Sequence, residues 1–125
     1  MNELRPIRAK DIYTYLEPDV ADLIWPYAQL SDPIFVGLYK GEYVCMVGFI
    51  PKTLLADEAF VWLQDGPAVQ RHKLLVGLYA KRLIKIALQR YPKLFGFCGT
   101  HSTKWLLSLG ADITFPRWVI EAKHE

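Results

Sequence analysis

The second half of the chain alternates between strand-like and helix-like patterns of hydrophobic residues. Glu58–Gln64 and Leu94–Cys98 are typical of strands, and residues from Pro67 to Tyr91 have apolar positions at helical spacing. A short helix is expected from Ser102 to Gly110, and a last strand from Phe115 to Ala122. A strand, a crossover helix and a next strand pack as a right-handed parallel unit. Such a unit leaves a cleft where the helix N-terminus can offer unpaired N–H groups to an anion.

The long helix is predicted to be amphipathic. Its apolar stripe consists of Leu75, Val76, Tyr79, Leu83, Ile86 and Ala87. The opposite side carries Lys81, Arg82, Lys85 and Gln89. This division predicts a surface helix that packs on a sheet. Pro67 fits its first turn, and Pro92 is expected to end it at Tyr91, because the residue before a proline avoids helical geometry.

The first half of the chain contains three further strand-like segments. Leu4–Ile7 is expected to be a short strand in which Pro6 marks an edge position or a strand end, because Pro6 has no N–H for a central ladder. Ile34–Tyr39 and Tyr43–Ile50 flank Lys40-Gly41-Glu42, and Gly41 can adopt the positive φ of a tight turn. We therefore predict a hairpin.

Two helices are expected between the first strand and this hairpin. Asp11 and Asp19 are candidate N-caps, and Pro26 predicts a kink or a break in the second helix. The apolar stripe of that helix has helical spacing and is expected to face the core. It consists of Val20, Leu23, Ile24 and Tyr27.

Composition favours one folded domain spanning residues 1–125. The chain is 52% hydrophobic and 14% aromatic, which gives it enough apolar surface for a core. No apolar run approaches the roughly 20 residues of a membrane span. The first residues contain no apolar signal core, so we expect a cytoplasmic protein.

The net charge of +2 conceals an asymmetry. Residues 1–66 carry five Lys/Arg against ten Asp/Glu, and residues 67–125 carry ten against three. One interpretation is a basic surface for the phosphates of a cofactor or a nucleic acid. The favoured interpretation is two solvated faces of opposite charge, because no run of basic residues is dense. Nucleic-acid binding is the least favoured of the functions considered, since no aromatic residue is interleaved with a basic run.

Residues with reactive side chains are few and scattered. Cys45 and Cys98 lie in apolar runs and are expected to be buried thiols without a disulfide. His72, His101 and His124 lack metal-ligand spacing, so no metal site is predicted. The four tryptophans are expected to be core or interface anchors. They are Trp25, Trp62, Trp105 and Trp118.

Several stretches, in order, resemble the GNAT family, the GCN5-related N-acetyltransferases. LRPIRAKDI resembles the family's opening, VGLYKGEYVCMVGFI its second and third strands, and WLLSLGA its late helix with a Leu-Gly end. The resemblance implies an α/β (α+β) GNAT-like acyl-CoA N-acyltransferase fold, with a mixed central sheet and flanking helices. QRYPKLFGFCGTHSTKWLLSLGADI is similar to small GNAT-like podophage proteins that include an internal virion protein. That likeness implies a phage protein in the host cytoplasm or the virion.

The segment at the family's cofactor loop departs from the enzymes' pattern. GNAT enzymes hold the acetyl-CoA pyrophosphate with Gln/Arg-x-x-Gly-x-Gly/Ala, where glycines let the backbone approach the phosphates. Here Arg71 is present, but neither glycine follows, and Gly66 precedes a proline that has no N–H. Tight acetyl-CoA binding is therefore not expected. If an acyl-CoA binds at all, its contacts would be Gln70, Arg71, His72 and Lys73.

The enzymes' catalytic positions are also altered. The resemblance places Gly99 where many members have Asn, and Leu106 where a Tyr protonates the leaving thiolate. Asp57 and Glu58 lie where some members carry a general base, and we interpret them as solvated carboxylates. His101 and Ser102 do not form a nucleophile pair, because adjacent helix residues do not face each other, and Ser102 is interpreted as a cap. No catalytic residue is predicted.

Three functions remain open. The first is a non-catalytic phage GNAT-fold protein that acts through protein contacts in virion assembly or in the host. The second is an active N-acetyltransferase with an atypical cofactor loop, and the third is a nucleic-acid-binding protein. A GNAT sheet splays between its fourth and fifth strands. Without a cofactor, side chains would close that gap, or a second copy or a peptide would fill it, next to Val61, Trp62, Leu63, Phe97 and Trp105.

Overall fold

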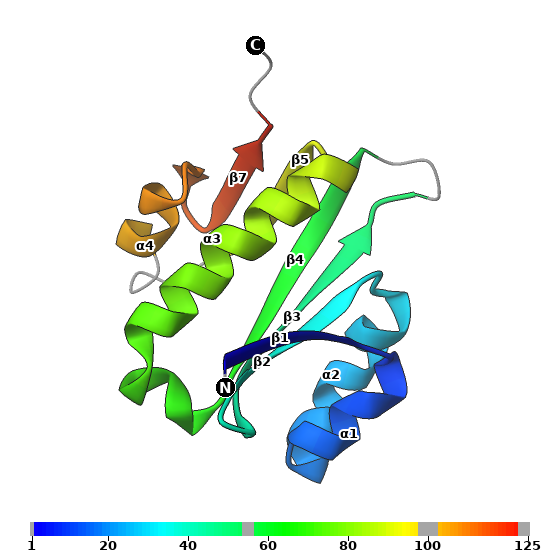
Figure 1. The fold of residues 1–125 in the computed structure, drawn as a ribbon. Coiled ribbons are helices and arrows are strands. Elements are labelled where there is room, and N and C mark those ends of the chain that lie inside the picture. Colours follow the sequence, from blue (N-terminus) through cyan, green and yellow to red (C-terminus); the bar gives the residue numbers. More distant parts are fainter. Residues whose placement is uncertain (1, 54–56, 98–102, 123–125) are drawn as a thin grey trace.

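The computed structural model describes residues 2–53, 57–97 and 103–122, which form a mixed sheet with helices on both faces (Figure 1). The sheet has seven strands in the order β1-β2-β3-β4-β5-β7-β6 within this described part. The strands are β1 Asn2–Ile7, β2 Ile34–Tyr39, β3 Glu42–Pro51, β4 Glu58–Asp65, β5 Lys93–Phe97, β6 Asp112–Thr114 and β7 Arg117–Glu121. The expected α/β fold class is confirmed.

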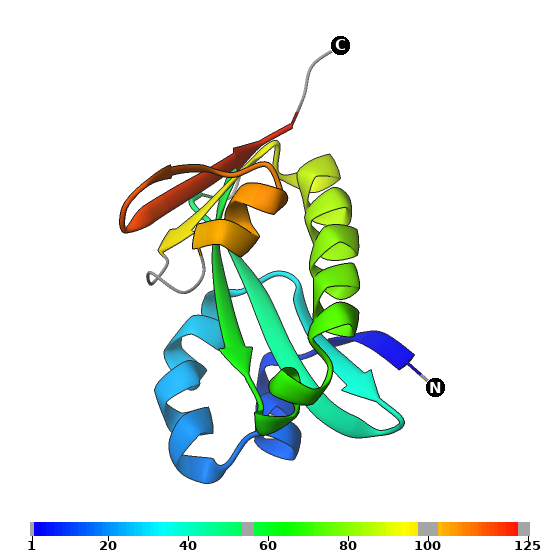
Figure 2. The same cartoon turned by 90° about the vertical axis from the view of Figure 1, so that its left-hand side faces the viewer.

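The helices lie in two groups on opposite faces of the sheet. Helices α1 (Ile12–Tyr15) and α2 (Pro18–Leu30) lie on one face, and α3 (Lys73–Arg90) and α4 (Thr103–Ser108) on the other (Figure 2). Short 3₁₀ helices, Ala9–Asp11 and Pro67–Arg71, precede α1 and α3. None of the described helices is long and apolar enough to cross a membrane.

The predicted strand pairings are confirmed. β1 is an edge strand, as Pro6 requires. The β2–β3 hairpin turns at Lys40 and Gly41, whose φ angles are 50° and 82°, so Gly41 supplies the left-handed conformation that most residues avoid. β4 and β5 pair in parallel, and α3 connects them across the sheet.

Helix α3 packs on the sheet through part of the predicted stripe. Tyr79, Leu83 and Ala87 are buried in this interface, and the predicted polar side is exposed. Leu75 and Val76 are only half-buried. Ile86 was wrongly placed in the stripe, because it is 45% exposed. A helix turns about 100° per residue, so Ile86 points about 100° away from the buried side on which Ala87 lies.

The predicted start of the long helix was also wrong. The chain from Pro67 to Arg71 is a 3₁₀ helix, and His72, with φ −130° and ψ 39°, separates it from α3. Helix α3 therefore begins at Lys73 and ends at Arg90, with Tyr91 as its C-cap as predicted. The 3₁₀ turn matters for the site, because it occupies the position of the expected cofactor loop.

Helix α2 packs on the sheet through only half of the predicted stripe, because Val20 and Ile24 lie against the core and the other two residues do not. Ala21 and Ala28 are buried, whereas Leu23 and Tyr27 of the predicted core stripe are 74% and 48% exposed. Small alanines allow a close approach to the sheet, which turns the larger residues outward. The helix also continues through Pro26, so no break occurs there.

One of the two predicted helix caps is in place, and the other was wrong. Asp11 occupies the N-cap position of α1 as predicted, but its side chain does not bond the N–H groups of that helix and instead accepts a hydrogen bond from the backbone N–H of Arg8 at 2.9 Å. Asp19 lies inside the first turn of α2, and Glu17 occupies its N-cap position. Both acidic residues still lie near helix starts, where a carboxylate is favourable.

The end of the chain forms a hairpin instead of one strand. Gly110 ends the α4 segment with φ 90°, as predicted. Residues Asp112–Thr114 then form β6, which the sequence did not reveal, and β7 begins at Arg117 rather than Phe115. The turn falls at Phe115-Pro116 because a proline cannot donate a ladder hydrogen bond.

Candidate functional site

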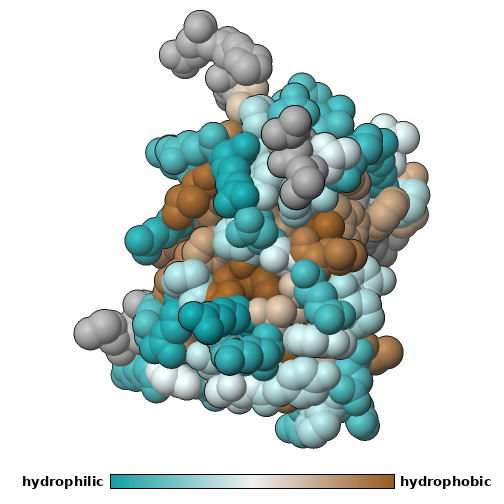
Figure 3. Space-filling model, turned by 90° about the vertical axis from the view of Figure 1, so that its right-hand side faces the viewer, coloured by the Kyte–Doolittle hydropathy of each residue, from teal (hydrophilic) through white to brown (hydrophobic). Residues whose placement is uncertain are grey.

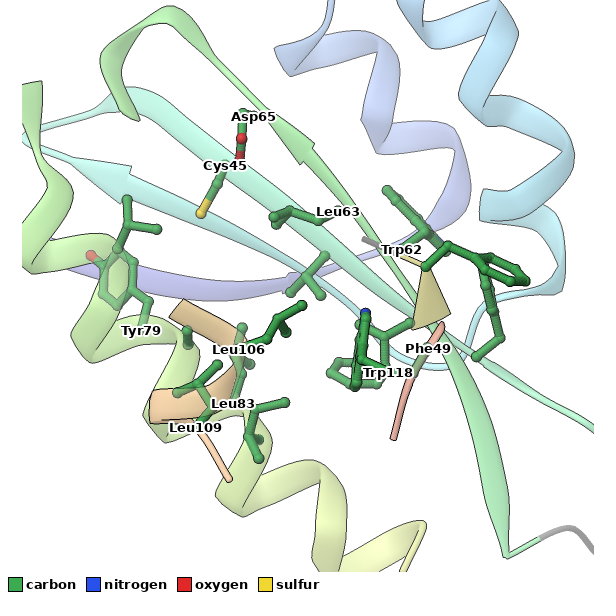
Figure 4. A pocket seen from close by; sticks show the side chains of 17 residues that line it. Cys45, Phe49, Trp62, Leu63, Asp65, Tyr79, Leu83, Leu106, Leu109 and Trp118 are labelled. Carbon is green, nitrogen blue, oxygen red and sulfur yellow. The ribbon is translucent and has the colours of Figure 1, made fainter. Parts of the chain in front are cut away.

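A cavity opens where β4 and β5 diverge. The two strands pair only at Glu58–Phe60 and Lys93–Phe95, while β4 continues along β3 to Asp65. A cavity of about 450 Å³ occupies the gap beyond Phe60 and is bordered by β3, β4, β5, α3, α4 and β7 (Figure 4). The expected splay of the sheet is therefore present, and side chains do not fill it.

Most of the cavity wall is apolar. Val61, Trp62, Leu63 and Phe97, which were expected around the gap, all line it. Trp105 was also expected next to the gap, but only its backbone is described, so its side chain lies outside the described part of the structure. Other lining residues, which the sequence did not single out as a group, are Val47, Phe49, Leu83, Ile84, Leu109 and Trp118.

Glycines on neighbouring strands leave the space that the rings of Trp62 and Trp118 occupy in the cavity wall. Trp62 lies opposite Gly48, and Trp118 lies opposite Gly96. A Cβ at either glycine would collide with the indole ring. The Trp62 Nε1–H also donates a 2.7 Å hydrogen bond to Ser31 Oγ at the end of α2. Trp62 and Trp118 are therefore core residues, and the indole N–H of Trp62 has the polar partner expected for a buried tryptophan.

The polar side chains of the wall lie at one end, near the end of β4. Cys45 and Asp65 are opposite each other in the β3–β4 register and lie close together in Figure 4. Burial, followed by the nearby Asp65 carboxylate, raises the pKa of the Cys45 thiol to about 11, so the thiol is neutral at neutral pH. Burial also raises the pKa of Asp65. The Tyr79 hydroxyl donates to the Leu38 carbonyl at 2.8 Å, so Asp65 supplies the carboxyl group of this end of the cavity.

Three of the predicted cofactor contacts, Arg71, His72 and Lys73, do not line this cavity. Arg71 donates to Glu42 Oε2 at 2.6 Å, and that hydrogen bond lowers the pKa of Glu42. The His72 ring lies 4.2 Å from the ring of Tyr39, and His72 Nε2 is 3.6 Å from Glu42 Oε1. Lys73 is exposed. For Gln70 only the backbone is described.

Residues considered for catalysis are either apolar or distant. Leu106, which the resemblance places at the family's general acid, is 4% exposed and lines the cavity. Glu58 lies near Lys52 and Lys93, at 3.6 Å from each ammonium, and neither it nor the exposed Asp57 lines the cavity.

The remaining candidates fall partly outside the described residues. Gly99, Cys98, His101 and Ser102 all lie in the segment 98–102. Cys45 is a free, buried thiol. Among the described residues, no cluster of three or more His, Cys, Asp or Glu side chains could hold a metal ion.

Comparison with known proteins places this architecture among the acetyltransferases. No protein-family model matches the chain, and no curated protein sequence matches it. Solved structures do. An acetyltransferase from Staphylococcus epidermidis is similar over 98% of this chain and 100% of its own, with a TM-score of 0.73 at 11% identity.

Two further structures agree. An N-acetyltransferase from Staphylococcus aureus matches over 98% of this chain and 99% of its own, with a TM-score of 0.70 at 14% identity. A spermidine N-acetyltransferase chimera of Vibrio cholerae and human sequences matches over 96% of this chain and 95% of its own, with a TM-score of 0.67 at 13% identity. The chain therefore has the fold of the GNAT acyltransferases. Identities this low show the fold alone.

Proposed function

We propose that this chain is a single-domain bacteriophage protein with a GNAT fold that has lost acetyl transfer and acts through protein contacts, in the host cytoplasm or the virion. The observation that carries the proposal is Leu106 in the cavity wall. Acetyl transfer from a thioester needs a proton for the leaving thiolate, and a buried leucine cannot donate one.

The electrostatics near the expected pyrophosphate site support the same conclusion. Asp65 places a carboxylate at the polar end of the cavity, where β4 ends, and a second anion there would be repelled. The Arg71 guanidinium is paired with Glu42 at 2.6 Å. The 3₁₀ turn also begins with Pro67, which has no N–H to offer.

The cavity and the free side of β4 suit an extended peptide. Residues 61–65 of β4 have no register partner on β5, so a peptide could add as a strand along them. At the rim, Leu63 and Phe97 are 47% and 67% exposed. An apolar side chain of such a peptide would enter the cavity, in the way that pockets beside an added strand give specificity.

The proposed phage origin rests on the likeness of residues 89–113 to small podophage proteins. Mass spectrometry of purified particles of the encoding phage distinguishes the two locations. A stoichiometric amount of the chain in the particle supports a virion role, and its restriction to the host lysate supports a host-directed role.

The alternative function is acyl transfer with an atypical cofactor loop. It is favoured by one observation: the gap between β4 and β5 is an open cavity of about 450 Å³, large enough for a small ligand. The pantetheine arm of acetyl-CoA contains two amides, which could pair with β4 as a peptide would. Acetyl-CoA is then the cofactor to test.

Thermal denaturation with and without acetyl-CoA separates the two functions. A ligand at a hundred times its Kd stabilises the folded state by about 2.7 kcal/mol. We expect no shift for the wild type. Glu42→Ala, which frees Arg71, is the matched variant. If acetyl-CoA also produces no shift in the melting temperature of this variant, the result supports a lost cofactor site. A clear shift for the wild type supports the acyl-CoA function and would overturn the proposal.

A further inference from the structure

Large hydrophobic side chains reach the surface in several places, and on one side of the molecule they gather across its middle (Figure 3). Two sets lie in lines along helices. On α2, Leu23, Tyr27 and Leu30 are 74%, 48% and 66% exposed. Their spacing of four and three residues places them on one side of the helix. We call this set the α2 stripe.

A second line lies on α3. Leu74 and Leu78 are 89% and 65% exposed, and Lys81 and Lys85 continue the line at helical spacing. This line, called the α3 stripe, lies opposite the buried side of the helix. Its leucines therefore contribute nothing to the core, and exposed leucines in a row are typical of a contact surface.

The two helices that carry the stripes have opposite charge. Helix α2 contains Asp19 and Asp22 and no basic residue. Helix α3 contains three lysines and two arginines and no acidic residue. Within the described part of the chain, Lys81 and Lys85 form no ion pair. The basic line on α3 therefore lacks an intramolecular acidic partner, and the exposed Asp19, one turn before Leu23 of the α2 stripe, supplies a complementary charge.

We propose that the α2 stripe of one copy of this chain docks on the α3 stripe of a second copy. The helices lie on opposite faces of the sheet (Figure 2), so one copy cannot pair its own two stripes. The contact uses different surfaces on the two partners, and such a head-to-tail interface builds rings or filaments. The inference uses neither the cavity nor its ligand, and so stands apart from the proposed function.

The dimensions of the helices agree with this pairing. At about 1.5 Å per residue, α2 is roughly 20 Å long and α3 roughly 27 Å, so the longer basic helix can cover the whole α2 stripe. A contact between two helices is small for a protein interface. We therefore expect reversible association that grows with protein concentration and weakens at high salt, because salt screens exposed charges.

Analytical ultracentrifugation of full-length variants tests the proposal. The α2 variant carries Leu23→Gln and Leu30→Gln, and the α3 variant carries Leu74→Gln and Leu78→Gln. All four side chains are exposed, so the fold should be kept, which circular dichroism checks. Leu107→Gln, at a leucine that is 59% exposed on α4, is the matched control.

The wild type should form dimers and larger species, and each variant should associate about tenfold more weakly. A mixture of the two variants should recover a pair, because one keeps its α2 stripe and the other its α3 stripe, and this pair should not grow further. Leu107→Gln should behave as wild type. A wild type that stays monomeric at about 1 mM, a mixture that forms no pair, or an equal loss in Leu107→Gln overturns the proposal.

Discussion

A methyl group at Gly48 would collide with the indole ring of Trp62. Gly48 lies directly opposite Trp62 in the β3–β4 register. A Cβ on Gly48 would meet the ring atoms Cε2, Cζ2 and Nε1 of Trp62 far inside normal contact distance. These atoms belong to a rigid ring with 8% exposure, so the Gly48→Ala variant must displace the whole indole.

The cost has two parts. Overpacking a well-packed core costs about 1–3 kcal/mol. Displacing the ring also breaks the hydrogen bond from Trp62 Nε1 to Ser31 Oγ, at 2.7 Å, and a typical intramolecular hydrogen bond contributes about 0.5–1.5 kcal/mol. We therefore expect Gly48→Ala to lower the free energy of unfolding by about 2–4 kcal/mol.

Urea denaturation, followed by tryptophan fluorescence and circular dichroism, measures this loss. Gly77→Ala is the control, because a Cβ at Gly77 meets nothing within 4 Å and alanine in a helix interior is favoured by roughly 0.5–1 kcal/mol. In a Trp62→Leu background, Gly48→Ala should lose most of its cost. If Gly48→Ala unfolds at the wild-type urea concentration, the reasoning about this pair is refuted.

Three further predictions concern the core and the polar end of the cavity. Leu83→Ala should lower the free energy of unfolding by about 2–5 kcal/mol, because Leu83 is buried in the main core; urea denaturation without a loss would contradict its placement. In a Cys98→Ser background, Cys45 should resist a thiol reagent until the protein unfolds, since burial raises its pKa to about 11 and the thiolate is the reactive form; rapid labelling of the folded protein would contradict this. Asp65→Asn should stabilise the protein near neutral pH but not below the ordinary pKa of a carboxyl group. Because the pKa of Asp65 is raised in the folded protein, the wild type loses stability as the pH rises through that pKa. Urea midpoints of wild type and variant, measured near neutral pH and below the ordinary carboxyl pKa, check this.

The fold could be predicted largely because local signals agreed with one another. Pro92 marked the end of α3, an apolar run marked β4, and Gly41 marked the hairpin turn. The face of α2 could not be predicted in this way, since Leu23 and Tyr27 have the spacing of a core stripe. Packing against the sheet determines which face of α2 is buried, because Ala21 and Ala28 let the helix approach the sheet closely.

The site was harder to predict because its contacts join distant parts of the chain. Asp65 meets Cys45 only through the β3–β4 register, and Arg71 meets Glu42 only because the β2–β3 hairpin lies beside the 3₁₀ turn. Strand β6 has three residues, too few for a periodic pattern. The splay between β4 and β5 followed from the family resemblance rather than from any residue pattern.

Isothermal titration calorimetry of the wild-type protein with acetyl-CoA tests the central claim most directly. The account predicts no saturable heat at ligand concentrations up to about 1 mM, because Arg71 is paired with Glu42, no glycine loop is present, and Asp65 lies at the polar end of the cavity. Micromolar binding that disappears in Arg71→Ala would contradict it, since the basic residues before α3 would then hold the pyrophosphate in place of the glycines.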